Sequence, residues 1–177
     1  NASQPVTVLP AGSGSITVGA LACDSVSLTA SGPGPFTWNV ISPPPFPNNP
    51  AYVKTSGYYS VTGIGVNGCP YTAGPVLVTV NKSPQVTITG QTQYCQGEAL
   101  NIKTSAAGIN YAWIRLPSTP VGTNSPNLNI IANTPGTFTY QVTVTAANGC
   151  TGSATYTITV DPVPGSASIV AGGPLTF

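Results

Sequence analysis

Alternation of apolar and polar residues is the dominant pattern along the chain. The clearest example is Tyr156-Thr157-Ile158-Thr159-Val160, in which every second side chain is apolar. A period of two is typical of β-strands with one buried face, and no stretch keeps the 3.6-residue apolar period of an amphipathic helix. The alternating runs are rich in β-branched residues and are separated by Gly, Pro and Asn, as strands joined by turns are. They predict an all-β chain with strands at residues 15–18, 25–30, 36–40, 58–66, 76–80, 85–89, 100–104, 110–115, 127–131, 137–146 and 155–160.

The order of features in the first half of the chain recurs in the second half. Each half has a cysteine before an alternating strand, then an aromatic-x-Trp triplet, then a Gly-x-aromatic strand that runs into Asn-Gly-Cys. The equivalent pairs are Cys23 with Cys95, Trp38 with Trp113, and Cys69 with Cys150. Members of a pair are roughly 70 to 80 residues apart, a period that suits a small β-sandwich domain. The repeat predicts tandem sandwich domains arranged end to end.

The repeat also predicts where the domains begin and end. The short linker Asn81-Lys82-Ser83-Pro84 separates one repeat at residues 11–82 from a second at residues 83–161. Residues 1–10 resemble the closing strand of a repeat, and residues 162–177 resemble the opening of one. We therefore interpret them as the tail of a preceding repeat and the head of a following one, in a window cut from a longer array.

Charge is scarce, which narrows the possible functions. The 177 residues include four Lys or Arg, three Asp or Glu and no His, for a formal net charge of +1. Phosphate neutralisation dominates nucleic-acid binding and requires a basic patch, so we expect no nucleic-acid partner. No apolar run approaches the roughly 18 residues of a membrane span. Disorder is not expected either, because 41% of the residues are hydrophobic.

The same inventory argues against catalysis. Without His the chain lacks the commonest general base. The carboxylates Asp24, Glu98 and Asp161 stand at strand or unit starts, and Asp24 and Glu98 occupy equivalent places in different repeats. A paired-carboxylate hydrolase needs two such groups within about 10 Å. We therefore expect no enzyme activity, no metal site and no cofactor.

The order of Cys, alternating strand, [Phe/Tyr]-x-Trp and a strand into Asn-Gly-Cys resembles a known kind of repeat. It is similar to the Ig-like and PKD-like tandem repeats of large Bacteroidetes cell-surface proteins, which include gliding-motility adhesins and other cargo of the type IX secretion system. The first unit departs from this pattern, because residues 43–50 are Pro-rich where middle strands are usual. The Asp-rich turn of PKD domains is missing, so the resemblance favours an Ig-like fold.

The resemblance gives several residues a role. On the third strand of an Ig-like sandwich, Trp38 and Trp113 are expected in the core; the competing interpretation is stacking on a sugar. Asp24-Ser25-Val26 is similar to sites that Bacteroidetes O-glycosylate, which makes Ser25 a candidate for glycosylation. The alternative is that Ser25 simply starts a strand.

The four cysteines suggest disulfides in a secreted protein. Pairing within a unit would join Cys23 to Cys69 and Cys95 to Cys150. In Ig topology, however, the start of the second strand and the Asn-Gly hairpin lie at opposite ends of the sandwich, farther apart than a disulfide reaches. A Cys23–Cys150 bond between repeats is favoured, with Cys69 and Cys95 bonded onward to other repeats. The intra-unit pairing stays open as the alternative.

The repetition indicates a structural function. We expect a segment of an extended extracellular stalk or filament at the cell surface, of the adhesin or motility type, which provides reach and mechanical continuity. Its partners would be neighbouring repeats of the same chain, and surface polysaccharide or other filament chains. The alternative is a carbohydrate-binding or adhesive Ig-like module, which exposed tryptophans would favour and buried tryptophans would disfavour.

Overall fold

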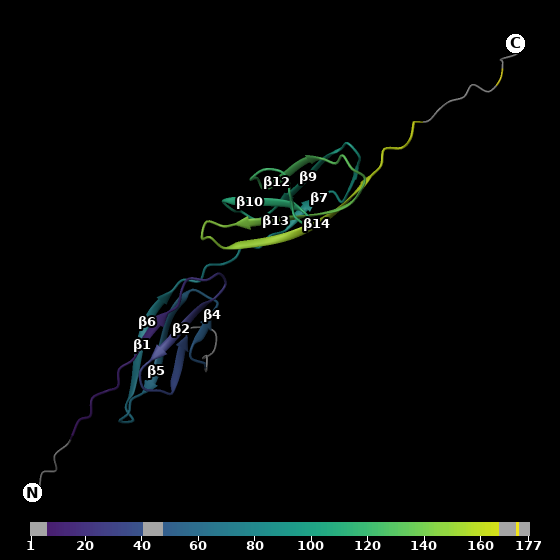
Figure 1. Ribbon diagram of the computed structural model, residues 1–177. Helices are drawn as coiled ribbons and strands as arrows, with labels where there is room; N and C mark the ends of the chain where they lie inside the picture. The colour runs from purple at the N-terminus through teal and green to yellow at the C-terminus, as the bar shows by residue number, and fades with distance from the viewer. Residues whose placement is uncertain (1–6, 41–47, 167–172, 174–177) are drawn as a thin grey trace, which may run out of the picture. The chain divides into compact units, whose positions relative to one another are not determined.

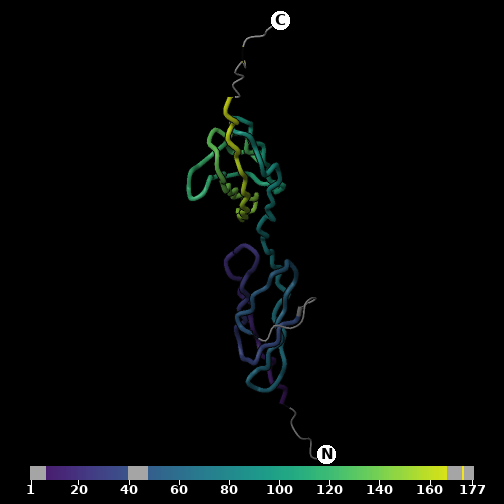
Figure 2. Tube along the Cα trace, turned by 90° about the vertical axis from the view of Figure 1, so that its right-hand side faces the viewer, coloured from purple at the N-terminus to yellow at the C-terminus, as the bar shows by residue number. Residues whose placement is uncertain are grey.

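The computed structural model describes residues 7–40, 48–166 and 173 of the chain. They form β-strands, turns and loops, with no helix among them, so the all-β prediction is confirmed (Figure 1). The chain divides into two compact units, Asn1–Ser83 and Pro84–Phe177. Within each unit the backbone doubles back repeatedly along the same direction (Figure 2), as expected of antiparallel strands.

Unit 1 is built from two three-stranded antiparallel sheets, with strand orders β1-β2-β4 and β3-β5-β6. The fourth strand in sequence thus pairs with the second, while the third pairs with the fifth. This split of the strands between two sheets is that of an Ig-like sandwich. The strands are β1 (Ser15–Val18), β2 (Val26–Ser31), β3 (Phe36–Val40), β4 (Ala51–Val53), β5 (Gly57–Ile64) and β6 (Pro70–Val78).

Unit 2 repeats this plan with two additional short strands. Its sheets have the orders β12-β9-β7 and β11-β10-β13-β14-β8. The short β8 runs parallel to the end of β14, whereas the other pairings are antiparallel. The strands are β7 (Ile88–Gly90), β8 (Gln93–Cys95), β9 (Ala99–Thr104), β10 (Asn110–Arg115), β11 (Thr119–Pro120), β12 (Asn127–Ile131), β13 (Gly136–Thr145) and β14 (Thr151–Asp161).

Each unit has its own hydrophobic core between its two sheets. In unit 1 the alternating strand β2 contributes Val26 and Leu28, which are 1% and 0% exposed, and they pack with residues of β3, β5 and β6. In unit 2 the equivalent strand β9 contributes Leu100 and Ile102, which are 0% and 1% exposed. Burial of every second side chain is what period-two alternation demands of a sheet with one covered face.

A tryptophan lies in each core, at equivalent positions of β3 in unit 1 and β10 in unit 2. Trp38 on β3 is 1% exposed and Trp113 on β10 is 3% exposed. The indole Nε1 of Trp38 donates a hydrogen bond to the carbonyl oxygen of Asn48 at 3.1 Å, and that of Trp113 donates to the carbonyl oxygen of Ser125 at 2.9 Å. The buried indole N–H is thereby satisfied in both units.

On the solvent-facing side of the sheets, hydrogen bonds between uncharged side chains connect neighbouring strands. The hydroxyls of Ser15 and Ser31 lie 2.7 Å apart across β1 and β2. The hydroxyls of Thr139 and Thr157 lie 2.9 Å apart across β13 and β14. Such cross-strand pairs stabilise a sheet by tenths of a kcal/mol to about 1 kcal/mol each.

Three strands were not predicted. The short β4 follows the Pro-rich run directly, so the prediction that residues 43–50 replace the middle strands of unit 1 is wrong in part; residues 41–47 lie outside the described residues. β8 and β11 were also missed, since strands of two or three residues leave too little alternation to detect.

The two compact units of the structure meet at Ser83 and Pro84, and the repeat bounds 11–82 and 83–161 stay predictions. Residues 1–6, 167–172 and 174–177, which belong to the predicted neighbouring repeats, lie outside the described residues. The described residues 7–14 and 162–166 carry no strand. The assignment of the two ends to neighbouring repeats and the end-to-end arrangement therefore stay predictions.

Replacing a core tryptophan should destabilise its own unit strongly. We expect Trp113→Ala to lower the free energy of unfolding of unit 2 by about 3–5 kcal/mol, because the change leaves a cavity and frees a loop carbonyl. Urea denaturation followed by circular dichroism measures this loss. The matched control is Ile109→Ala, whose side chain is 67% exposed, with an expected change below about 0.5 kcal/mol. Equal effects of the two substitutions would contradict the assignment.

Candidate functional site

The duplicated Asn-Gly-Cys forms the same turn in both units. The Asn67 side-chain oxygen accepts a hydrogen bond from the Cys69 amide at 3.2 Å, and Asn148 does the same for Cys150 at 3.0 Å. The glycine between them has a positive φ, 78° at Gly68 and 81° at Gly149, which side chains with a Cβ rarely adopt. The turn therefore places one cysteine of each unit directly before that unit's last strand.

The other cysteine of each unit lies at the far end of the same last strand. In unit 2, Cys95 pairs in parallel with Asp161, the final residue of β14. In unit 1, Cys23 forms an isolated parallel bridge with Asn81, and the Asp24 amide donates to the Asn81 carbonyl at 2.7 Å. A short parallel contact with the end of the last strand thus fixes this cysteine in both copies.

Asp24 strengthens this contact in unit 1. Its Oδ1 accepts a hydrogen bond from the Ser83 amide at 3.2 Å. Hydrogen bonds from the side chain and the backbone of Ser83 hold the pKa of Asp24 below its usual range. Asp24 also has a positive φ of 67°, a conformation that Asp tolerates better than most residues. The carboxylate therefore ties the segment after Cys23 to the end of the unit.

The separation of the two cysteines within a unit decides which bonds are possible. β14 contains 11 residues, so its ends are roughly 30 Å apart. A disulfide requires Cα atoms within about 7 Å. The intra-unit pairs Cys23–Cys69 and Cys95–Cys150, which the sequence left open, do not fit this geometry. Cys23 and Cys150 are disulfide-bonded, whereas Cys69 and the exposed Cys95 carry free thiols.

The remaining candidate residues are spread over the structure. Ser25 is half-buried and immediately precedes β2, so its glycosylation stays a prediction. Glu98 accepts a hydrogen bond from the Cys95 amide at 2.9 Å, and Asp161 accepts one from Gln93 at 2.7 Å. In the part of the chain that the structure describes, no three His, Cys, Asp or Glu residues lie close enough to bind a metal. No membrane-spanning helix is found among those residues.

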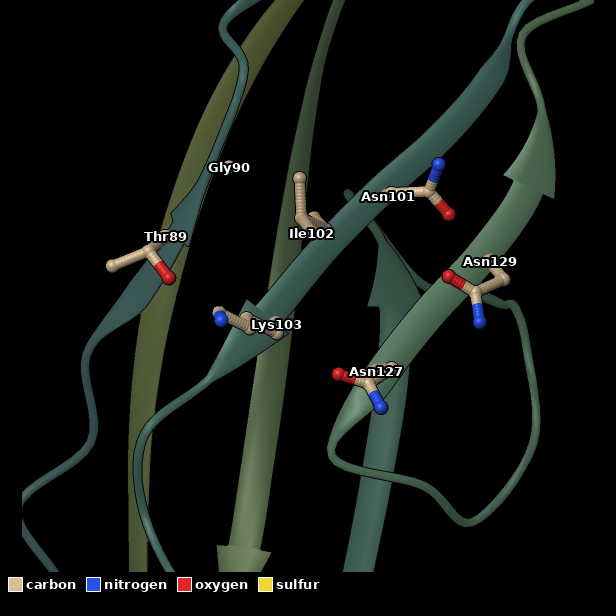
Figure 3. Close-up of a pocket in the computed structure, with 7 residues that line it drawn as sticks. All are labelled: Thr89, Gly90, Asn101, Ile102, Lys103, Asn127 and Asn129. Atoms are coloured by element: carbon tan, nitrogen blue, oxygen red, sulfur yellow. The ribbon is translucent and has the colours of Figure 1, made fainter.

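Sequence reasoning missed an asparagine-rich face on unit 2. Asn101 and Lys103 of β9 are paired across the sheet with Asn129 and Asn127 of β12, and all four side chains are exposed. Figure 3 shows the three amide groups on these two neighbouring strands, with Thr89 on β7 beside Lys103. Together they line an open depression of about 270 Å³. Amides offer both donors and acceptors, the groups needed to bind hydroxyls.

The equivalent face of unit 1 has a different chemistry. The register places Ser27 and Tyr52 where unit 2 has Asn101 and Asn129. An amide array is therefore not a requirement of the sandwich. The alternation in Asn127-Leu128-Asn129, with polar residues two apart on a strand, was the sequence signal that could have revealed it.

No protein-family model matches the chain, and no curated protein does. Solved structures with a similar fold include fibronectin(III)-like modules of Clostridium thermocellum CbhA, at 16% identity and a TM-score of 0.41 over 88% of this chain and all of that one. Three N-terminal domains of the bacteriophage RB49 outer capsid protein Hoc are 19% identical, with a TM-score of 0.36 over 85% of this chain and 59% of that one. An intimin fragment, solved with a receptor domain, is 19% identical with a TM-score of 0.39, over 81% and 62%. The chain thus spans about 60% of the Hoc and intimin chains.

The thiol states can be measured directly. We expect a maleimide to label two cysteines per chain in the folded protein, Cys69 and Cys95, because Cys95 is exposed and Cys69 is partly so. Cys23 and Cys150 should react only after reduction of the unfolded protein, because both are disulfide-bonded and Cys150 is also buried. Mass spectrometry of the labelled peptides identifies the sites. Labelling of none of the four cysteines would indicate two disulfides and contradict the assignment.

Proposed function

We propose that the chain is a segment of an extended extracellular stalk or filament, built from Ig-like modules that are joined covalently. The observation that carries the proposal is the position of the cysteines, one at each end of the last strand in both units. A cysteine pair that spans a module cannot staple that module. It can only connect the module to something beyond its ends.

In this proposal Cys23 of unit 1 bonds to Cys150 of unit 2. It is supported by the bonded state of these two cysteines and the free thiols of Cys69 and Cys95. The bond would close a loop of more than a hundred residues, which the chain-entropy model associates with about 4.7 kcal/mol of stabilisation. It would also restrict bending at the linker between the units, which suits a mechanical role.

The two free thiols would allow the same kind of disulfide to be formed with the adjacent repeats. Cys69 occupies the same turn as Cys150, and Cys95 the same parallel contact as Cys23. Cys69 would bond to the repeat before this segment and Cys95 to the repeat after it. Every junction of the array would then have one staple. A secreted protein at the cell surface, where disulfides persist, is the setting that this chemistry requires.

Disulfide mapping of the chain tests the staple. Proteolysis under non-reducing conditions should release a linked peptide that contains Cys23 and Cys150. Cys23→Ser should abolish this peptide and leave Cys150 a free thiol that a maleimide labels once the protein is unfolded, because its side chain is 1% exposed in the fold. The matched variant Cys69→Ser should change neither result. A linked peptide that contains Cys69 or Cys95 in place of this pair would refute the proposal.

A second candidate function is binding of a neutral polysaccharide by the asparagine-rich face of unit 2. The observation that favours it is the exposed set of Asn101, Asn127 and Asn129 on two paired strands. Both tryptophans are buried, which excludes them as a stacking platform. On this face the exposed amides would supply the hydrogen bonds to the sugar hydroxyls. An adhesive module of this kind is compatible with a stalk.

Affinity electrophoresis tests this second function. Gels that contain a soluble β-glucan, mannan or galactan should retard the protein in at least one case. The double variant Asn101→Ala/Asn129→Ala should lose most of the retardation, because it removes a facing amide pair. The control Asn39→Ala removes an exposed amide from unit 1 and should leave mobility unchanged. Unretarded migration in all three gels would reject this function.

A further inference from the structure

The single arginine of the chain lies at a small cavity in unit 2. Arg115 ends β10, and its guanidinium lies over the ring of Phe138 at 5.3 Å from the centroid. Arg115, Phe138 and Tyr140 line a cavity of about 230 Å³, together with residues of the segment that follows β12. This cavity shares no residue with the asparagine-rich face.

The positive charge in this cavity lacks an anionic partner within the described part of the chain. Glu98 and Asp161, the two carboxylates of unit 2, are hydrogen-bonded to the Cys95 amide and to Gln93. The guanidinium contacts the face of Phe138, and no ion pair is found for it among the described residues. A ring on one face orients a guanidinium while its N–H edge stays available, which is the geometry that binds a carboxylate through two hydrogen bonds.

The other polar groups of the cavity are neutral. Tyr140 is 5% exposed, and burial raises the pKa of its hydroxyl, with the charge of Arg115 acting in the opposite direction. The hydroxyl therefore keeps its proton and can donate. Asn133 and Thr134 contribute further polar side chains, while Ile130 and Val160 supply an apolar wall. One cation, several neutral hydrogen-bonding groups and an apolar wall together match a sugar ring that carries a carboxylate.

Hydrogen bonds hold the rim of the cavity in place before any ligand arrives. The Ala132 amide donates to the Glu98 carbonyl at 2.9 Å, and the Gly97 amide donates to the Ala132 carbonyl at 2.8 Å. The side chain of Gln96 donates to the Asn133 carbonyl at 2.9 Å. A fixed rim reduces the entropy lost on binding, which matters for a weak ligand.

Unit 1 lacks this arrangement although it has the same tyrosine. The register opposite Tyr59 is occupied by Val40, whereas the register opposite Tyr140 is occupied by Arg115. The Tyr59 hydroxyl donates to the Thr55 carbonyl at 2.7 Å, so it is satisfied within its own unit. For the Tyr140 hydroxyl, no hydrogen bond is found among the described residues. The fold therefore does not require a tyrosine hydroxyl without a hydrogen-bond partner to lie beside an arginine.

We propose that this cavity binds one uronic acid residue of an acidic polysaccharide, with the carboxylate on Arg115 and the ring hydroxyls on Tyr140, Asn133 and Thr134. Pockets for drug-sized ligands have volumes of about 300 Å³ or more. This cavity is smaller, so it suits a single sugar residue. A peptide C-terminus would offer the carboxylate but not the ring of hydroxyls that the neutral side chains match. The proposal does not depend on the disulfide staple.

NMR titration gives a direct test, because the side-chain Nε–Hε signal of the one arginine needs no assignment. Galacturonic acid and glucuronic acid are added separately to the ¹⁵N-labelled chain, with glucose and a dipeptide as comparisons. We expect a saturable shift of the arginine signal with at least one uronic acid and none with glucose. No saturable shift with either uronic acid, or saturation by the dipeptide alone, would overturn the proposal.

Variants locate the binding. Backbone amide shifts should show at least tenfold weaker uronic acid binding in Arg115→Gln, because the charge-assisted bonds are lost. Arg115→Lys keeps the charge without the two-pronged geometry and should bind with intermediate affinity. The control Lys54→Gln removes one positive charge from unit 1, and this variant should bind the uronic acid with unchanged affinity. Equal weakening in Arg115→Gln and Lys54→Gln would indicate non-specific charge attraction and refute the site.

Discussion

The length of the last strand in each unit is the constraint on which the rest of the structure depends. This strand runs alongside its antiparallel neighbour for most of its length and also contacts a short parallel segment at its end. Because backbone hydrogen bonds hold it extended, its ends are separated by roughly 25 Å in the nine-residue β6 and roughly 30 Å in the 11-residue β14. The cysteine before the strand is thereby held apart from the cysteine that contacts the strand's other end. The cysteines, the Asn-Gly turn and the linker all take their positions from this separation.

Much of this arrangement could be predicted from alternation and repetition. The strands at Ser15–Val18, Phe36–Val40, Asn110–Arg115 and Asn127–Ile131 have the predicted bounds, because each has a full set of alternating residues between turn formers. The two aromatic-x-Trp triplets gave positions that the structure shows to be buried. The repeat of the same features in the two halves of the chain was the stronger guide to the fold, because it related residues that are far apart in the sequence.

Other features depend on pairing that a linear pattern does not encode. The parallel contact of β8 with β14 brings Cys95 beside Asp161, residues far apart in the sequence. The cavity at Arg115 arises because β10 and β13 are neighbours and because the segment after β12 closes over them. No spacing rule connects Arg115, Asn133 and Tyr140. The amide array on β9 and β12 likewise becomes visible only when the register is known.

The neutral hydroxyl pairs on the solvent faces of the sheets have a consequence for the environments in which the protein can work. Ser15 with Ser31 and Thr139 with Thr157 connect neighbouring strands without any ionised group. Ion pairs between exposed residues weaken as ionic strength rises, and carboxylates lose their charge in acid, but hydroxyl pairs do neither. With seven Lys, Arg, Asp and Glu residues in all, four cationic and three anionic, little of the fold depends on screened interactions. We therefore expect the pairing of these strands to respond little to ionic strength.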